Sequence, residues 1–76
     1  MKRLSDAKSG EQGVICAIEG DARFLSRVTS IGLTLGSPVT ILKNEKKRPI
    51  LLYSRDSTVA LNREECAKIQ IGGAAT

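Results

Sequence analysis

Apolar residues, many of them β-branched, occur in five short runs that glycines, prolines and charged residues separate. Runs of this length between turn residues are typical of strands. The pattern therefore predicts strands at residues 14–18, 39–42, 49–53, 58–61 and 68–71. Because a small domain cannot cover the open edges of a sheet, we expect these strands to close into a small antiparallel β-barrel.

A helical pattern interrupts the strands after the first of them. Phe24, Val28 and Ile31 recur at the spacing of one helical face. Asp21 precedes this pattern and can cap the first turn by accepting a hydrogen bond from a backbone N–H. Gly32 follows the pattern and is expected to end the helix in the left-handed conformation. The fold should thus carry a helical insertion after its first strand.

A shorter helical signal precedes the last strand. Asn62 and Glu65 have the spacing of a capping box, which predicts one helical turn over residues 63–67. Glycines mark the connections between elements, and four of them are predicted to form structural turns: Gly10, Gly13, Gly32 and Gly36. The charged stretch at residues 43–48 is predicted to be an exposed hairpin loop.

The length of 76 residues limits the chain to one domain with a thin core. Only Phe24 and Tyr53 are aromatic, so aliphatic side chains must fill most of that core. The residues predicted to be buried are Val14, Cys16, Phe24, Val28, Ile31, Val39, Ile41, Leu61 and Ile69. We expect residues 1–71 to form the domain and residues 72–76 to be a flexible C-terminal tail.

The charge balance leaves the type of partner open. Twelve Lys and Arg against eight Asp and Glu give a net charge of +4, which permits binding to a polyanion without demanding it. Three of these charges, Lys46, Lys47 and Arg48, are consecutive. On nucleic acid they would contact phosphates, but Tyr53 alone could stack on a base. Otherwise they would meet an acidic protein surface or an anionic membrane leaflet, or form a solubilising loop tip.

The inventory of reactive residues argues against catalysis. The chain has no histidine, no G-x-S-x-G turn and no Walker loop, so we expect no enzyme activity and no catalytic residue. Cys16 and Cys66 lie far apart without a C-x-x-C motif and are predicted to be buried thiols outside any disulfide or metal site. Neither a metal site nor a cofactor is expected, with weak surface binding through Glu19 and Asp21 as the alternative.

The apolar runs are short compared with targeting or membrane segments. The longest, residues 14–18 and 50–53, fall far below the roughly 20 residues that a membrane-spanning helix needs. The charged N-terminus is not followed by the apolar stretch of a signal peptide. We therefore expect a cytoplasmic protein without membrane insertion, peripheral at most at the inner face of the membrane.

Several short motifs follow one another along the chain. They are Leu4-Ser5-Asp6, Gly10-Glu11-x-Gly13-Val14, the helical residues 25–31, Gly32-Leu33-x-x-Gly36-x-x-Val39-x-Ile41, Val59-Ala60-Leu61 and Glu65-x-Ala67-x-Ile69-x-Ile71. In this order, over residues 4–71, they resemble the ferrous iron transport protein A (FeoA) family. The resemblance implies a five-stranded SH3-like barrel with a helical insertion, similar to the C-terminal domain of some metal-dependent repressors. Members commonly have proline where this chain has Leu35, so the loop there should be more exposed.

The resemblance also implies a function, an accessory role in ferrous iron uptake through contact with the cytoplasmic part of the membrane iron transporter FeoB, which carries a G domain. The candidate partner-binding residues are Arg23, Arg27, Leu33 and Leu35, and separately Lys46, Lys47 and Arg48. Two other functions stay open: a nucleic-acid-binding barrel, and a regulatory domain related to metal-dependent repressors, although the chain has no winged-helix segment. Self-association also stays open. The family carries a label of transition-metal binding, for which this chain offers few ligands.

Overall fold

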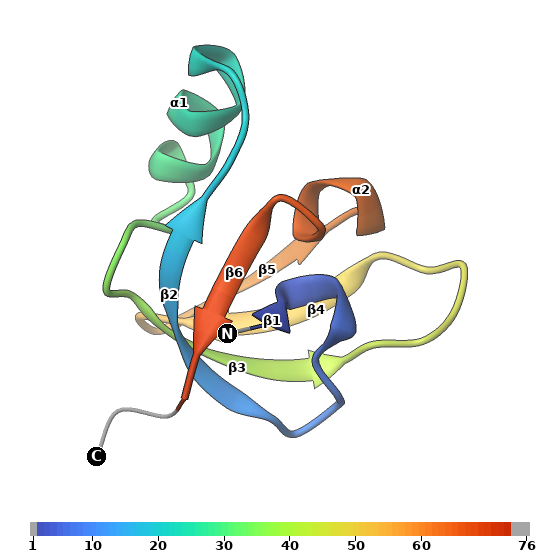
Figure 1. Cartoon of the computed structure of the whole chain (residues 1–76). Helices are drawn as coiled ribbons and strands as arrows, with labels where there is room; N and C mark the ends of the chain where they lie inside the picture. Colours follow the sequence, from blue (N-terminus) through green and yellow to red (C-terminus); the bar gives the residue numbers. More distant parts are fainter. Residues whose placement is uncertain (1, 74–76) are drawn as a thin grey trace.

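The computed structural model describes residues 2–73, which form one antiparallel sheet with two short helices (Figure 1). The elements are β1 (Lys2–Arg3), the 3-10 turn η1 (Leu4–Asp6), β2 (Gln12–Ile18), α1 (Ala22–Ser30), β3 (Pro38–Lys43), β4 (Ile50–Ser54), β5 (Ser57–Leu61), α2 (Arg63–Cys66) and β6 (Ile69–Gly72). Across the sheet the strands lie in the order β1-β6-β2-β3-β4-β5. The mainly β, antiparallel, SH3-like fold predicted from the sequence is confirmed.

The sheet has six strands where five were predicted, and β1 is the additional one. Lys2 and Arg3 pair with Ile71 and Gln70 of β6. Two exposed charged residues carry no apolar alternation, so no pattern in the sequence marks this strand. Among residues 2–73, β1 and β5 lie at the two ends of the strand order and do not pair with each other. The curled sheet is therefore open at its edges, and the expected closure into a complete barrel is wrong.

β2 shows which face of a continuous apolar run turns inward. Ile15 is buried, whereas Val14 is half-buried and Cys16 is exposed, so the predicted burial of Val14 and Cys16 is wrong. In a run of five apolar residues the alternation of side chains is invisible, and only the pairing with neighbouring strands decides the face. The pairing with β6 also shifts register between Ile15 and Ala17, which marks a β-bulge at Cys16.

Gly13 lies inside β2, opposite Val39 of β3, so its predicted role as a turn residue is wrong. A Cβ at this position would lie 2.7 Å from the carbonyl oxygen of Gly72. Gly13 is therefore required for a close approach of two strands. The other three glycines predicted at turns have positive φ angles, Gly10 at 88°, Gly32 at 94° and Gly36 at 87°, which glycine adopts without strain.

Helix α1 begins and ends as predicted. The Phe24 N–H donates to Asp21 Oδ1 at 2.9 Å, which is the N-cap. At the other end the Gly32 N–H donates to the Thr29 carbonyl at 3.0 Å and the Leu33 N–H to the Val28 carbonyl at 2.9 Å. This pair of bonds is a Schellman motif.

The apolar face of α1 differs from the prediction at its last position. Phe24 and Val28 are buried as predicted, but Ile31 is 37% exposed. Ile31 follows the last helical residue as the C-cap, so its side chain leaves the helical face. Leu33, after the reversal at Gly32, reaches the core in its place and is 0% exposed. The predicted burial of Ile31 is therefore wrong.

Helix α2 begins at the predicted cap. The Glu65 N–H donates to Asn62 Oδ1 at 2.8 Å and the Asn62 N–H to Glu65 Oε1 at 3.2 Å, which confirms the capping box.

Gly72 belongs to β6, so the expected tail does not begin there; residues 74–76 of that tail lie outside the described residues. Within residues 2–73, no helix has the length and apolar character that crossing a membrane requires.

Candidate functional site

An open, largely apolar groove lies between α1, β2 and the loop that follows α1. Its volume is about 720 Å³. β2 contributes Cys16, Ala17 and Ile18, α1 contributes Leu25 and Thr29, and the loop contributes Thr34 and Leu35. Helix α1 stands beyond the end of β2 and projects away from the sheet (Figure 1). We call this surface the α1–β2 groove.

Two leucines expose apolar surface at the α1–β2 groove. Leu35 is 65% exposed and Leu25 is 38% exposed. Single exposed leucines are ordinary on protein surfaces, but apolar side chains gathered around a hollow mark a site of interaction. The expectation that Leu35 is exposed is thus met, while Leu33 is fully buried in the core and cannot contact a partner. Leu33 was a candidate partner-binding residue, but the Schellman motif turns its side chain inward, as a core role for this leucine requires.

The loop that carries Leu35 is held firmly in place. The buried Ser37 Oγ accepts the Thr34 N–H at 3.1 Å and the Arg55 Nε–H at 3.3 Å. The Gly36 N–H donates to the Ile15 carbonyl at 2.8 Å, and the Ile15 N–H donates to the Ser37 carbonyl at 2.9 Å. These bonds tie the loop to β2 and to the turn between β4 and β5. Leu35 is therefore presented in one geometry, which lowers the entropy cost of binding.

Polar contacts join α1 to the rest of the fold. Arg27 forms an ion pair with the buried carboxylate of Glu65 in α2. Lys68 Nζ lies 4.9 Å from the centroid of the Phe24 ring, a cation–π distance. Arg27, predicted as a partner contact, thus has a structural role, whereas Arg23 is exposed on α1.

The second predicted surface lies elsewhere. Lys46, Lys47 and Arg48 are exposed in the loop between β3 and β4, as predicted. Figure 1 shows this loop extending on the side of the sheet away from α1. The structure therefore separates the two groups of candidate residues into two surfaces.

The two thiols differ in environment. Cys66 is buried, and this burial raises the pKa of its thiol to about 11, against a smaller opposing effect of the Arg63 charge. A thiol with such a pKa is unreactive at neutral pH. Cys16 lines the α1–β2 groove, and its Sγ–H donates to the Gln70 carbonyl at 3.4 Å. Cys16 and Leu25 line the groove but were not among the candidate residues taken from the sequence. Leu25 could have been found, because a leucine outside the apolar face of a helix indicates exposed apolar surface.

The acidic residues are dispersed over the fold. Within residues 2–73, no three His, Cys, Asp or Glu side chains come together in a group that could hold a metal ion. Of the acidic pair considered for weak binding, Asp21 caps α1, and Glu19 Oε1 accepts the Gln70 Nε2–H at 2.9 Å. Glu11 forms an ion pair with Lys2 at 2.8 Å, and this contact lowers the pKa of Glu11.

The chain is similar in sequence to known proteins. Residues 2–72 match the FeoA domain. Over 70 residues, or 91% of this chain, it is 34% identical to an Fe(2+) transport protein A/Fe(2+) transporter FeoB fusion protein of Porphyromonas gingivalis, of which it spans only 8%.

Solved structures show the same fold. The crystal structure of an iron uptake regulatory protein (FeoA) superposes with a TM-score of 0.87 at 22% identity, covering 91% of this chain and 92% of the other. A manganese-dependent transcriptional repressor superposes with a TM-score of 0.88 at 23% identity, covering 95% of this chain but 41% of the repressor. At such identities these likenesses establish the fold alone. The domain match over residues 2–72 and the 34% identical relative show that this chain belongs to the FeoA family.

Proposed function

We propose that this protein is a cytoplasmic accessory factor of ferrous iron uptake that binds the cytoplasmic part of the transporter FeoB through the α1–β2 groove. The observation that carries the proposal is the Porphyromonas gingivalis relative, in which a transport protein A and FeoB form one fusion protein. Fusion raises the effective concentration of one domain at the other, which favours a direct contact between them.

The α1–β2 groove is suited to such a contact. Its apolar centre at Leu25 and Leu35 offers an anchor that a partner can bury, and interface energetics depend on such anchors. The firmly held loop at Thr34–Ser37 presents Leu35 without a large ordering cost. The expected mode of action is binding and regulation, not bond-breaking chemistry.

Neither of the other two functions is favoured by a specific observation. The likeness to the repressor covers 41% of that protein at 23% identity and concerns the fold. For nucleic acid, the Tyr53 hydroxyl is bound to Asp56 Oδ1 at 2.9 Å, and this hydrogen bond raises the pKa of Tyr53. Tyr53 is one stacking platform, whereas single-strand binders usually present several aromatic side chains.

The test is capture of detergent-solubilised FeoB by the immobilised protein. The double variant Leu25→Asp with Leu35→Asp should lose capture by at least about tenfold, because a carboxylate is costly to desolvate in an apolar contact. Its melting temperature should change little, since both side chains are exposed. Leu42→Asp is the control for Leu35→Asp alone, because each adds one negative charge and Leu42, which is 43% exposed, lies in β3 outside the groove.

Capture at parental strength by the folded double variant would exclude the groove as the contact. Equal loss of capture in Leu42→Asp and in Leu35→Asp would show that added negative charge, rather than the groove, weakens binding. Failure of the parent protein to capture FeoB, with and without bound guanine nucleotide, would contradict the proposed function itself.

A further inference from the structure

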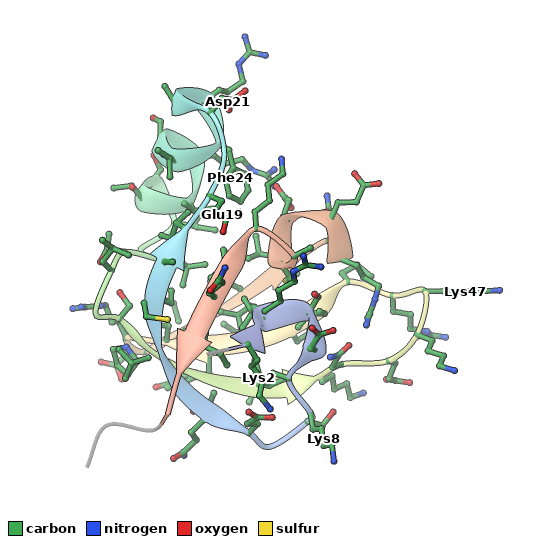
Figure 2. All side chains as sticks on the ribbon, in the orientation of Figure 1. Lys2, Lys8, Glu19, Asp21, Phe24 and Lys47 are labelled. Carbon is green, nitrogen blue, oxygen red and sulfur yellow. The ribbon has the colours of Figure 1, made fainter. Side chains whose placement is uncertain are left out.

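The loop between β3 and β4 carries a strong concentration of positive charge. With Lys43 at the end of β3 and Arg63 of the adjacent helix α2, the loop gathers five of the chain's twelve basic residues. These five residues, which we call the basic hairpin, are Lys43, Lys46, Lys47, Arg48 and Arg63. Figure 2 shows Lys47 at the tip, pointing away from the body of the protein.

The basic hairpin is braced rather than loose. Arg63 Nη1–H donates to the Glu45 carbonyl at 2.9 Å and to the Arg48 carbonyl at 3.5 Å. On the other side of the loop, Asn44 Nδ2–H donates to the Ser5 carbonyl at 3.1 Å, and the Asn44 N–H donates to Ser9 Oγ at 3.1 Å. These bonds fix both ends of the loop to α2 and to the N-terminal segment. The cations therefore project from a defined platform.

Two carboxylates lie beside the basic hairpin, Glu45 in the loop and Glu64 in α2, so its five cations leave an excess of three positive charges. Of the ion pairs found in residues 2–73, one involves this surface, and it joins Lys43 Nζ to Glu45 Oε1 at 4.0 Å. That distance between two exposed side chains contributes little. The charges of Lys46, Lys47 and Arg48 are thus available to a negatively charged partner.

The surroundings of the basic hairpin indicate which partner fits. Beside it lies a small, mostly apolar hollow of about 260 Å³, which is lined by Pro49, Leu51 and Ala60 and by the charged residues Lys43, Glu45 and Arg48. Cations beside apolar surface match the interfacial layer of a membrane, where anionic headgroups border acyl chains. Nucleic acid is less suited, because this part of the chain has no aromatic side chain for stacking.

We propose that the basic hairpin docks the protein on anionic phospholipid at the membrane surface. The proposal rests on the proposed function for the presence of a membrane near the protein. Because the basic hairpin lies on the side of the sheet away from α1, lipid contact leaves the α1–β2 groove open to FeoB (Figure 1). The two surfaces together orient the protein between the lipid headgroups and the transporter.

The test is co-sedimentation of the protein with vesicles of phosphatidylcholine alone or of phosphatidylcholine and phosphatidylglycerol in equal parts. The protein should bind only the anionic vesicles, and binding should fall as added salt shortens the Debye length from about 10 Å at 0.1 M to about 3 Å at 1 M. Lys46→Gln, Lys47→Gln and Arg48→Gln combined should weaken binding roughly 100-fold, at about fivefold per charge.

A matched control removes the same charge elsewhere. Arg3→Gln, Lys8→Gln and Arg23→Gln change three exposed cations outside the basic hairpin, and this variant should keep most of the vesicle binding. Thermal melting should show both triple variants folded. Because FeoB capture in detergent needs no bilayer, the hairpin variant should still capture FeoB, so failure of the lipid proposal is distinct from failure of the proposed function.

Three results would overturn the lipid proposal. One is equal binding to vesicles with and without phosphatidylglycerol, or no binding to either. Another is equal loss of binding in both triple variants, which would assign the effect to net charge alone. The third is tighter binding to a single-stranded RNA than to the anionic vesicles at the same salt, lost in the hairpin variant, which would reassign the basic hairpin to nucleic acid.

Discussion

Gly13 has only a hydrogen atom in place of a side chain, and this allows strands β2 and β6 to approach each other closely. A Cβ there would lie 2.7 Å from the carbonyl oxygen of Gly72 and 3.1 Å from Ile71 Cδ1. The methyl group of Ile71 can move, but the Gly72 carbonyl belongs to the backbone of β6. Any residue larger than glycine must therefore push β2 and β6 apart.

Gly13→Ala should lower the free energy of unfolding by roughly 2–3 kcal/mol, at the upper end of the cost of overpacking a tight core. Gly73→Ala is the control, because a Cβ at Gly73 meets no atom within 4 Å and its effect should stay within about 0.5 kcal/mol. Urea denaturation followed by circular dichroism measures both. Equal stability of the two variants would contradict the close approach of β2 and β6.

The sequence identifies buried residues where side-chain spacing is distinctive. Six predicted core residues are confirmed: Phe24, Val28, Val39, Ile41, Leu61 and Ile69. Val14 and Cys16 were misplaced because an unbroken apolar run hides its alternation, and the bulge at Cys16 depends on pairing with β6. Ile31 was misplaced because the Schellman motif reverses the chain after it and brings Leu33 into the core instead. Each error lies where distant strands or a chain reversal determine the direction of a side chain.

At the scale of elements, α1 is attached to the sheet by few side chains. Phe24 and Val28 bury its apolar face, and the ion pair of Arg27 with Glu65 fixes it to α2. The caps of both helices could be predicted because a cap depends on residues within one helical turn. The strand β1 could not, because it exists only through its pairing with β6, more than sixty positions along the chain.

Val28→Asp should unfold the protein, because a lone buried carboxylate costs several kcal/mol against a stability on the order of 5 kcal/mol for a domain of this size. Ser26→Asp, at an exposed position of the same helix, is the control and should leave the fold intact. Circular dichroism and thermal melting distinguish the outcomes. A cooperatively folded Val28→Asp variant with parental stability would refute the inward orientation of this helical face.

At the scale of the whole molecule, the fold places two candidate surfaces apart from each other. The sequence alone does not show how these surfaces lie relative to one another. The α1–β2 groove forms because α1 projects beyond the end of β2, and the basic hairpin extends on the side away from it (Figure 1). Composition indicated binding rather than catalysis, and the charged run at Lys46–Arg48 was visible directly. The groove was only partly predictable, since residues from three separate elements line it.

The arrangement of the carboxylates determines how well the protein can bind ferrous iron, the ion that the transporter carries. Glu65 is engaged by Arg27 and by the Asn62 N–H, and Glu11 is engaged by Lys2. Asp21 caps α1, and Asp56 accepts a hydrogen bond from Tyr53. Ferrous iron is held in proteins by imidazole and clustered carboxylates, and this chain has no histidine.

The isolated protein should therefore bind ferrous iron no more tightly than a Kd of roughly 10⁻⁴ M, as expected for scattered surface carboxylates. Anaerobic calorimetry measures this affinity directly. Glu19→Gln with Asp21→Asn is the informative variant, because Asn still caps α1 while the two charges nearest each other in that segment are removed. A one-to-one micromolar site in the parent that this variant abolishes would overturn the prediction and make the protein an iron carrier. It would mean that Glu19 and Asp21 bind iron more strongly than they bind the Gln70 amide and the Phe24 N–H.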